Sequence, residues 1–268
     1  MSNNPLVSII MSTYNNEKTI GECISSILNQ TYTHWEFLIC NDCSTDDTSR
    51  ILNNLAKRDK RIKIFSNKAN LGLARNLNKC IKYSEGKYIA RMDADDISLP
   101  TRLEKQIDFL EKNPDIDILG TSMIINDGKT NLGIRKNTKE LTRFSFLKGS
   151  PFFHPTIVIK RKVLEELGGY STKVYRTEDL DLWFRLYQKG YTGANLDEAL
   201  YVYQESLSDL KKRNMKAAIS ATKVFFNGFN KINIPIHKRL IAFKPIFSCI
   251  LPNTFVNNYH MKKLTRKE

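Results

Sequence analysis

The chain has 268 residues, of which 41% are hydrophobic, so it can bury a sizeable core in one large domain or in one domain with an appendage. A mean hydropathy of −0.39 is typical of a soluble globular protein. The start of the sequence, Met1–Pro5, has no basic segment leading into a long apolar run. The five cysteines form no disulfide-like framework. We therefore expect no signal peptide and a reducing, cytoplasmic environment, which excludes a secreted disulfide scaffold.

The positive charge is concentrated at the C-terminal end. Residues 205–268 contain 13 Lys and Arg against three Asp and Glu, a net charge of +10 out of +14, which leaves +4 for residues 1–204. Such a tail can bind nucleic acid or an anionic membrane. The apolar stretch Leu240–Val256 is interrupted by Lys244, Pro245 and Pro252, and a membrane span needs about 20 apolar residues.

We expect the tail to form an interfacial segment, in which aromatic residues next to Lys and Arg contact the membrane surface. These aromatic residues are Phe225, Phe226, Phe229, Phe243 and Phe247. The alternative is a helical appendage that packs on the body and exposes a basic face to solvent.

The first 125 residues alternate between strand-like and helix-like patterns. Strands are expected at residues 6–12, 35–41, 62–66, 87–92 and 116–124, with helices between them. Pro100 suits the first turn of the fourth helix. This alternation predicts βαβ units with right-handed crossovers and a mostly parallel sheet, whose ligands bind at the carboxyl ends of the strands.

The pattern is looser after Gly128. We expect a short helix at 139–147, a strand at 154–160, a helix at 162–167 that ends at Gly168-Gly169, a helix at 178–189 and extended chain at 191–203. From residue 207 onward the sequence predicts helices.

The fourth strand runs directly into a group of carboxylates. Tyr88–Arg91 is followed by Met92, and then Asp93, Asp95 and Asp96 stand within four positions. Carboxylates at a strand end repel one another unless a cation joins them, and Mg²⁺ or Mn²⁺ held by one or two of them keeps positions open for substrate phosphates. The alternative is an ordinary acidic turn before a helix.

Two more polar loops follow strands. Thr13, Tyr14, Asn15 and Glu17 follow the first strand, where a nucleotide could lie or where turn and capping chemistry could suffice. Asp42 ends the second strand and could accept a hydrogen bond from a nucleobase N–H.

The loop after Asp42 has features that need no ligand. Ser44 and Asp47 have the spacing of a helix-capping box. The C-x-x-C spacing of Cys40 and Cys43 has no second pair, so we read it as coincidence and not as a zinc site.

The segment Asn70–Asn76 leads into the third expected helix. Gly72 suits a tight loop before a helix, and Arg75 on the first helical turn could reach a phosphate or simply lie on the surface. The sequence contains neither G-x-G-x-x-G nor G-x-x-x-x-G-K-[ST], which argues against a dinucleotide oxidoreductase and against a P-loop enzyme.

A second acidic group begins a helix near residue 178. Thr177 is a plausible N-cap, and Glu178 and Asp179 in the first turn gain typically 0.3–1 kcal/mol from the helix dipole. The functional hypothesis is that Asp179 faces the same cleft as Asp95 and serves as a general base. The apolar residues that follow at helical spacing are expected in the core: Leu180, Trp183, Phe184 and Tyr187.

Taken in order and spacing, these motifs resemble those of family 2 glycosyltransferases, over roughly residues 5–205. The chain is similar to the short bacterial members that build capsule, O-antigen or lipooligosaccharide. The resemblance implies a GT-A fold for residues 1–205, followed by a basic helical extension at 206–268. It also implies a cytoplasmic enzyme that is peripheral on the inner membrane face.

The resemblance further implies an inverting transfer from a nucleotide sugar, expected to be a UDP-hexose or UDP-N-acetylhexosamine, to a saccharide or lipid-linked saccharide. Asp42 would bind the nucleobase, Asp93 would lie near the ribose, Asp95 would ligate Mn²⁺ or Mg²⁺, and Asp179 would be the base. The full set of expected donor-binding residues is Thr13, Tyr14, Asn15, Glu17, Asp42, Asn70, Gly72, Arg75, Asp93, Ala94 and Asp95. His154 and Glu178 are candidates for the acceptor site, although His154 could equally be structural.

Two departures from the family pattern matter. Many relatives have two acids and a glycine where this chain has Asn41, Asp42 and Cys43, which weakens the nucleobase assignment. The Q-x-x-R-W pattern of processive synthases is absent, which argues for the addition of one sugar.

Two alternatives remain at this point. One is a nucleotidyl- or phosphotransferase that uses the same metal-diphosphate edge, although such chemistry need not place a base as far downstream as Asp179. The other is a basic nucleic-acid-binding protein, but the charge lies mostly in the tail and no familiar binding motif appears. We therefore expect no nucleic-acid partner.

Overall fold

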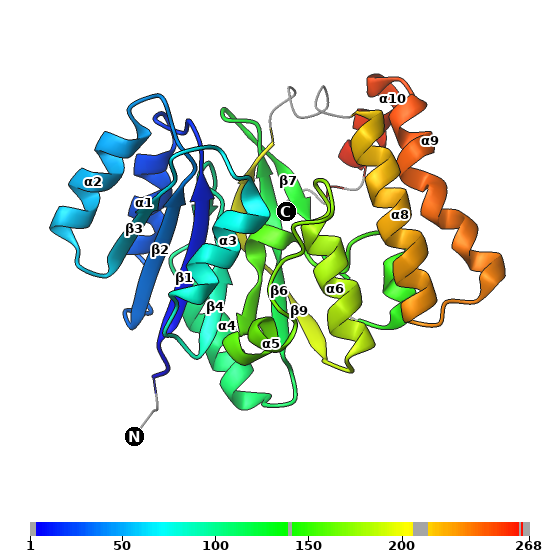
Figure 1. Cartoon of the computed structure of the whole chain (residues 1–268), viewed down its shortest axis with the longest axis horizontal. Coiled ribbons are helices and arrows are strands. Elements are labelled where there is room, and N and C mark those ends of the chain that lie inside the picture. Colours follow the sequence, from blue (N-terminus) through cyan, green and yellow to red (C-terminus); the bar gives the residue numbers. More distant parts are fainter. Residues whose placement is uncertain (1–3, 139–140, 206–213, 263, 265–268) are drawn as a thin grey trace.

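The computed structural model describes residues 4–138, 141–205, 214–262 and 264. Its described part contains a nine-stranded sheet with the order β3-β2-β1-β4-β8-β6-β9-β5, and β7 pairs with β6 at the side. Helices cover both faces of this sheet (Figure 1). The predicted α/β class is confirmed.

The N-terminal half of the sheet is parallel. Its strands are β1 (Val7–Thr13), β2 (Trp35–Asn41), β3 (Ile62–Ser66) and β4 (Tyr88–Arg91). The expected bounds of these four strands are correct to within one residue. Because all four run in the same direction, their carboxyl ends and the loops that follow lie along one edge of the sheet.

The C-terminal half is mixed. Strand β8 (Val158–Lys160) is antiparallel to both β4 and β6 (Ile118–Asn126), whereas β9 (Gly193–Gln204) is parallel to β6 and antiparallel to β5 (Ile97–Ser98). The sequence pattern predicted neither β5 nor β7 (Asn131–Arg135). Two residues are too few for β5 to show an alternating pattern, and β7 contains Asn131 and Gly133, which are uncommon in strands.

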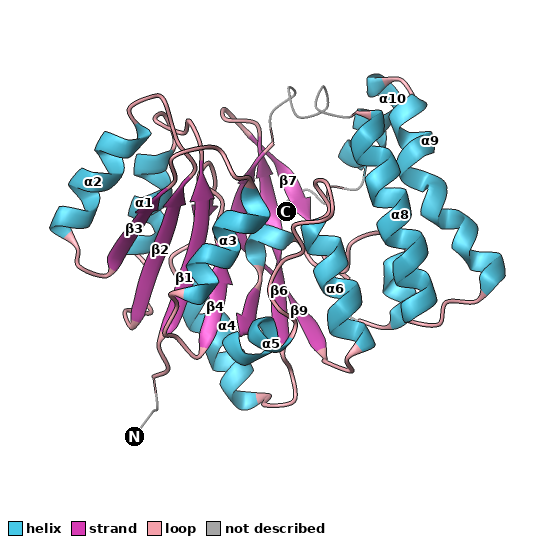
Figure 2. Ribbon diagram, viewed as in Figure 1, coloured by secondary structure: helices cyan, strands magenta, loops and turns pink. Residues whose placement is uncertain are grey.

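Each face of the sheet has its own helices (Figure 2). One apolar cluster contains residues of α1 (Ile20–Leu28), α2 (Thr48–Arg58) and α4 (Arg102–Lys112). The other contains residues of α3 (Leu73–Lys82), α5 (Arg161–Glu166) and α6 (Glu178–Gln188). Strand residues alternate between the two clusters, as the period of two requires.

Two local expectations need correction. The strand expected at 154–160 begins as a 3₁₀ turn, η2 (His154–Thr156), and only then becomes β8. The helix expected at 139–147 is a 3₁₀ segment, η1 (Arg143–Leu147), while residues 139–140 lie outside the described part of the chain.

The C-terminal extension packs on the body through α8 (Met215–Lys231), which lies against α6 (Figure 1). The ring of Phe184 on α6 contacts Phe225 and Phe229 on α8, with centroid distances of 6.1 and 5.8 Å. Phe229 is fully buried and Phe225 is half-buried, so the expectation that these two aromatic residues contact a membrane is wrong. They instead join α8 to the core.

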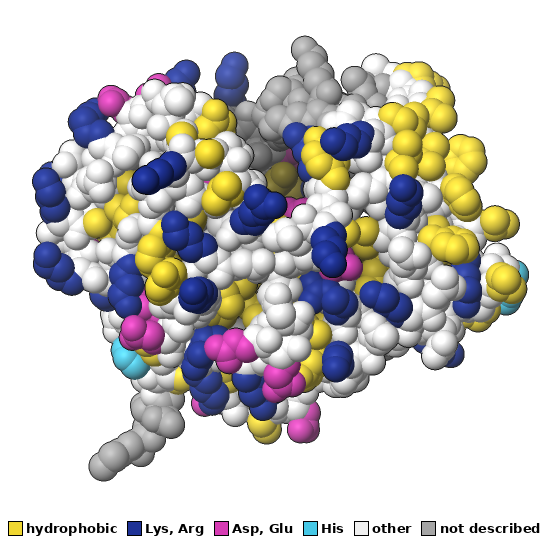
Figure 3. Space-filling model, viewed as in Figure 1, with side chains coloured by type: hydrophobic (Ala, Val, Ile, Leu, Met, Phe, Trp, Pro, Cys, Tyr) yellow, Lys and Arg dark blue, Asp and Glu magenta, His cyan; other side chains and the backbone are white. Residues whose placement is uncertain are grey.

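The outer side of the extension is different. Beyond α8 lie η3 (Ile236–Phe243), α9 (Lys244–Ile250) and α10 (Asn253–Lys262). Five of their large apolar side chains are two-thirds or more exposed, and we call them the distal apolar face: Ile236, Leu240, Phe247, Ile250 and Phe255. Figure 3 shows hydrophobic side chains gathered along the side formed by α9 and α10. Among the described helices, none is both long and apolar enough to cross a bilayer.

The contact between α6 and α8 depends on a glycine, which gives a first prediction. A Cβ atom on Gly228 would lie 2.2 Å from the ring of Phe184, so Gly228→Ala should force the two helices apart. We expect the free energy of unfolding to fall by about 1–3 kcal/mol, as for other overpacked cores. Urea denaturation followed by circular dichroism would measure this.

Gly21 provides the control, because it is also helical and a Cβ atom there would meet nothing within 4 Å. Gly21→Ala should leave the stability unchanged or raise it by up to about 1 kcal/mol through helix propensity. Equal stabilities of the two variants would show that α8 is not tightly seated on α6.

Candidate functional site

The segment after β4 is fixed from both sides of the sheet edge. The backbone N–H of Asp93 donates to the hydroxyl of Tyr201 in β9 at 3.1 Å. From the first helix, Thr19 donates to the carbonyl of Ala94 at 3.1 Å, and the Cys23 thiol donates to the carbonyl of Asp93 at 3.2 Å. The acidic turn is therefore held in one position without any ligand.

A buried arginine accompanies this turn. Arg91, the last residue of β4, forms an ion pair with Asp93 through its Nη1 atom. Burial opposes the charge on Arg91, but Asp93, together with Tyr201 and Tyr170, outweighs burial and raises the pKa of the guanidinium. The sequence analysis did not single out Arg91. The sequence does hold one indication of its importance. Arg91 is a cation on an otherwise apolar, buried strand, and a buried charge needs a partner of opposite charge.

The three carboxylates of the acidic run have different surroundings. Asp93 is half-buried, Asp95 is exposed, and Asp96 is buried, where it accepts a hydrogen bond from the Gln204 backbone N–H at 2.8 Å. Burial, with Asp93 and Asp95 nearby, raises the pKa of Asp96 well above the usual range. Asp96 therefore belongs to the packing against β9, while Asp93 and Asp95 remain at the sheet edge.

The oxygen atoms at this edge fit a magnesium or manganese ion that is only partly held by protein. Within the described ranges, no three His, Cys, Asp or Glu side chains are grouped as a complete metal cage. Mg²⁺ normally takes one or two carboxylates and fills its other positions with water and substrate phosphates. The exposed carboxylate of Asp95, with Asp93 two residues before it, suits this mode of binding.

The loops after β1 and β2 are cross-linked to each other. The Asn15 backbone N–H donates to Ser44 Oγ at 3.0 Å, and Asn15 Oδ1 accepts from the Thr45 N–H at 2.9 Å. A second reciprocal pair joins Glu17 to Asp46 and Asp47 at 3.1 Å each. The two loops thus form one rigid unit beside Thr13.

These contacts correct one interpretation. Ser44 does not cap helix α2, because its hydroxyl oxygen accepts a hydrogen bond from the Asn15 backbone N–H. Asp47 is the N-cap residue, but its side chain makes no capping hydrogen bond. Instead Asp46 accepts from the Thr48 backbone N–H at 3.0 Å. The capping box expected for Ser44 and Asp47 is therefore wrong, because a partner from another loop was not visible in the local spacing.

Asp42 holds the loop before α3. Its carboxylate is buried and accepts hydrogen bonds from the backbone N–H groups of Leu71 and Gly72 at 2.8 and 2.9 Å, and from the Asn67 side chain at 2.9 Å. Burial alone would raise the pKa of Asp42, but these hydrogen bonds lower it overall. Asp42 thus has a structural role, and its contact with a nucleobase stays a prediction.

The candidate catalytic helix α6 begins near the same edge. Thr177 is its N-cap, although without a capping hydrogen bond from the side chain, and Glu178 and Asp179 occupy the first turn as predicted. Burial raises the pKa of Asp179, and the Leu180 backbone N–H and the charge of Arg91 oppose that shift only in part. Arg91, the partner of Asp93, is therefore within electrostatic reach of Asp179.

His154 has a neutral, structural environment. Its Nε2 atom lies 2.8 Å from the hydroxyl of Tyr170, and its ring contacts Trp183 with a centroid distance of 6.0 Å. Burial and the nearby Arg91 lower the pKa of His154 well below its usual value. An acceptor role for His154 stays a prediction.

The largest of the described cavities, about 700 Å³, opens at this edge. The segment Asn70–Arg75 forms one wall and the segment Thr172–Glu178 includes the other lining residues, so Asn70, Gly72, Arg75 and Glu178 come together. Tyr14 is about half exposed. The roles given to the individual donor and acceptor residues stay predictions.

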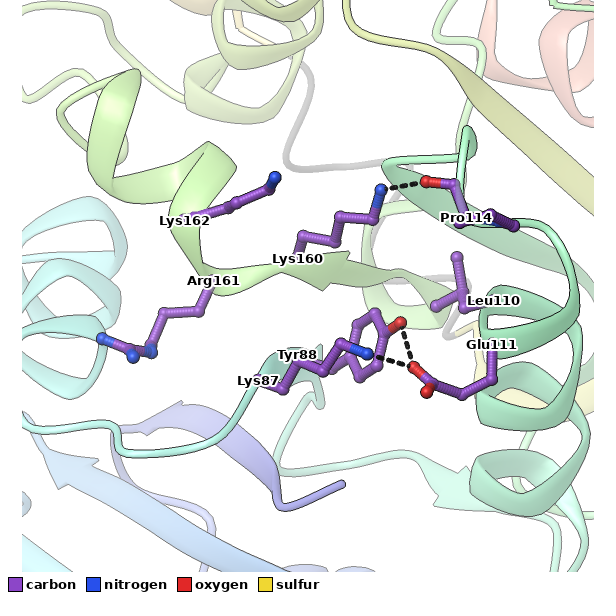
Figure 4. A pocket seen from close by; sticks show the side chains of 8 residues that line it. All are labelled: Lys87, Tyr88, Leu110, Glu111, Pro114, Lys160, Arg161 and Lys162. Carbon is purple, nitrogen blue, oxygen red and sulfur yellow. Dashed lines mark hydrogen bonds and ion pairs between the residues drawn. The ribbon is translucent and has the colours of Figure 1, made fainter. Parts of the chain in front are cut away.

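A second cavity, of about 410 Å³, has a basic lining (Figure 4). It lies where β4 begins and β8 ends, at the opposite end of these strands from Asp93. Three of the four cations that line it, Lys87, Lys160 and Arg161, have partners within the protein. Lys87 pairs with Glu111 at 2.6 Å, and Lys160 contacts the Pro114 carbonyl at 2.6 Å. The sheet edge that carries Asp93 and Asp95 is the better candidate site.

Comparison with known proteins agrees with this geometry. The model of glycosyl transferase family 2 matches residues 8–168. The "Putative glycosyltransferase EpsE" of Bacillus subtilis is 37% identical over 271 residues, which cover 100% of this chain and 98% of that protein. The "UDP-Glc:alpha-D-GlcNAc-diphosphoundecaprenol beta-1,3-glucosyltransferase WfgD" of Escherichia coli is 37% identical over 181 residues, 68% of this chain and 69% of that protein.

A solved structure shares the fold. The mannosyltransferase PcManGT from Pyrobaculum calidifontis, in complex with GDP-Man and Mn²⁺, matches with a TM-score of 0.69 and 19% identity, over 97% of this chain and 81% of that one. These findings decide against the nucleotidyl- and phosphotransferase alternative. The chain belongs to glycosyl transferase family 2, and it is a glycosyltransferase with the GT-A fold.

Proposed function

We propose that this enzyme transfers one sugar, with inversion, from a UDP-hexose or UDP-N-acetylhexosamine to a saccharide or lipid-linked saccharide in bacterial surface polysaccharide synthesis. The observation that carries the proposal is the cavity of about 700 Å³ that brings the segment Asn70–Arg75 together with Glu178 at the start of α6. The relative from Escherichia coli supports the choice of donor and acceptor, because its name gives UDP-Glc and a diphosphoundecaprenol-linked sugar.

On the donor side, Asp95 ligates Mn²⁺ or Mg²⁺, and Asp93 lies near the ribose. The metal, when bound, neutralises the negative charge that develops on the departing nucleoside diphosphate. The loops around Asn15 and Glu17, which are hydrogen-bonded to their neighbours, give the nucleotide a preformed binding surface. Arg75, which lines the cavity, binds a donor phosphate. Because such a site is already ordered, little of the binding free energy of the nucleotide is lost to ordering the protein.

On the acceptor side, Asp179 removes the proton from the attacking hydroxyl. A base works best when its pKa lies near the working pH, and burial moves the pKa of Asp179 upward in that direction. Attack from the side opposite the leaving group, in a single displacement, inverts the anomeric centre.

The donor assignment predicts the behaviour of Asp95→Ala. Calorimetry of the wild-type protein with UDP should show binding that requires manganese, and Asp95→Ala should abolish it because the ion loses its main ligand. Asp108→Ala is the matched control, since Asp108 is an exposed aspartate on α4 that pairs with Lys112. If Asp95→Ala binds UDP as tightly as this control, the metal assignment is wrong. If the wild type ignores UDP, the same titration with GDP, dTDP and CMP identifies the nucleotide or excludes a donor site.

The base assignment predicts a separation between binding and transfer. Asp179→Asn should bind UDP and manganese like the wild type but lose about 10²–10⁴-fold in transfer, the usual contribution of a general base. Asp181→Asn, on the same helix, is the control, because Asp181 is paired with Arg185. Transfer from UDP-glucose to a synthetic GlcNAc-diphosphate lipid would be one suitable assay.

The pH profile adds a second readout. Because the pKa of Asp179 is raised, wild-type kcat/KM should fall on acidification at a higher pH than an ordinary aspartate would cause, as the base becomes protonated. The residual activity of Asp179→Asn should lack this acid limb. Collapse of UDP affinity in Asp179→Asn would mean that Asp179 is not simply the base.

We also propose that the enzyme is peripheral on the cytoplasmic side of an anionic membrane. The distal apolar face, with Lys231, Lys238 and Lys244 exposed nearby, supports this, since apolar insertion and cationic attraction together favour such binding. A lipid-linked acceptor would lie in the same membrane.

The membrane proposal can be tested with the triple variant Leu240→Gln, Phe247→Gln and Ile250→Gln. All three side chains are exposed, so the fold should persist. Cosedimentation with vesicles of phosphatidylglycerol and phosphatidylcholine should weaken by about tenfold or more, because three apolar side chains no longer insert. Tyr83→Gln, an exposed aromatic residue on the body, is the control. Sedimentation of the triple variant like the control would refute the proposed docking face.

A further inference from the structure

The wall of the large cavity formed by the loop before α6 has no assigned role except at Glu178. Thr172, Val174, Tyr175 and Arg176 line it, facing the segment Asn70–Arg75 across the cavity. Among the donor residues expected from the sequence, Asn70, Gly72 and Arg75 line this cavity, and all three lie in the segment Asn70–Arg75. The loop before α6 is therefore free to serve the other substrate.

This loop brings two cations to one aromatic ring. The guanidinium carbon of Arg176 lies 5.6 Å from the ring centroid of Tyr175, and Nζ of Lys216, on α8, lies 4.6 Å from the same centroid. The face of a tyrosine ring attracts cations, and because both charges lie close to one centroid they are at most about 10 Å apart. An anion at this position would be attracted by both.

The position of Arg176 is imposed by its surroundings. Its φ angle of 55° lies in the left-handed region, which is costly for a residue other than glycine, typically about 1–3 kcal/mol. The loop is tied to α8 on both sides of Arg176, since the Tyr175 N–H donates to Ser220 Oγ at 3.1 Å and Thr177 Oγ1 lies 3.4 Å from the same atom. The backbone of Arg176 is thus fixed two residues from Glu178 and three from Asp179, with its guanidinium beside the ring of Tyr175.

The surface beyond the two cations is apolar. Met215, Ile219 and Phe226 are each more than one-third exposed, and their spacing of four and seven residues places them on one stripe of α8. A molecule that follows this path meets carboxylates first, then two cations, then an apolar stripe. That order corresponds to a hydroxyl-bearing sugar, a diphosphate and a lipid chain.

We propose that Arg176 and Lys216 form a subsite for the diphosphate of a lipid-diphosphate-linked acceptor. The inference deepens the proposed function and rests on it. The carboxylates of Glu178 and Asp179 repel the diphosphate, so the sugar end points toward the base and the charged end toward Arg176. The lipid chain leaves along Met215 and Ile219 toward the membrane.

The donor also carries a diphosphate, so the experiment must keep the two sites apart. The full chain is first saturated with UDP and Mg²⁺, which fills the donor site, and is then titrated with farnesyl diphosphate in a calorimeter. We expect the wild type to bind this probe, and Arg176→Gln and Lys216→Gln each to weaken binding by about tenfold, the loss of one charge-assisted contact. Neither change should alter the affinity for UDP, whereas Arg75→Gln should.

Lys223→Gln is the matched control, because Lys223 is an exposed lysine two turns further along α8 and, unlike Lys216, does not contact the ring of Tyr175. The control should bind the probe like the wild type. Binding of farnesyl diphosphate only when UDP is omitted would overturn the subsite, because the probe would then be occupying the donor site. Equal probe affinities for Arg176→Gln, Lys216→Gln and the control would also overturn it.

Kinetics give an independent readout. With a GlcNAc-diphosphate lipid as acceptor, Arg176→Gln should raise KM for the acceptor by about tenfold with little change in KM for the donor. With an acceptor whose diphosphate is replaced by a simple alkyl glycoside, the variant and the wild type should behave alike. Failure of the wild type to bind UDP would count against the proposed function, whereas a probe that fails to bind a UDP-competent protein would refute the subsite alone.

Discussion

The ion pair between Arg91 and Asp93 is the interaction on which the rest of the site depends. Arg91 lies on a buried strand between β1 and β8, where an unpaired guanidinium would be very costly, since breaking a buried pair typically destabilises a protein by about 3–5 kcal/mol. Asp93, two residues after Arg91, supplies the compensating negative charge. The acidic turn therefore has to start where it does.

The same cation connects the two halves of the enzyme. Arg91 lies two residues after Ile89 in β4, so both are on the same face of the sheet. Ile89 belongs to the apolar cluster that contains α3, α5 and α6. It lowers the pKa of His154 and partly opposes the upward shift of the pKa of Asp179. The acidic turn after β4 and the start of α6 thus share one electrostatic environment, although they are far apart in the sequence.

Much of this fold could be predicted because its signals are local. The period-two strands and helical stripes of the first 125 residues identified the parallel half of the sheet, and the acidic residues of α6 marked its first turn. What could not be predicted depends on long-range contacts. Ser44 was assigned to its own helix because its true partner, Asn15, belongs to another loop. Phe229 looked like a membrane residue because nothing in its own segment reveals Phe184. Asp42 likewise gains its role from the N–H groups of Leu71 and Gly72.

The seating of α8 on α6 has a consequence for how such enzymes diversify. The outer surface of α6 is completed by a ring, Phe184, that is 1% exposed because Phe225, Gly228 and Phe229 of α8 cover it and Phe146 stacks on it. The C-terminal extension therefore cannot be exchanged between relatives on its own, because Phe184 would lose the side chains that pack against it. A productive exchange must carry the outer face of α6 along with α8, so these two helices are inherited together.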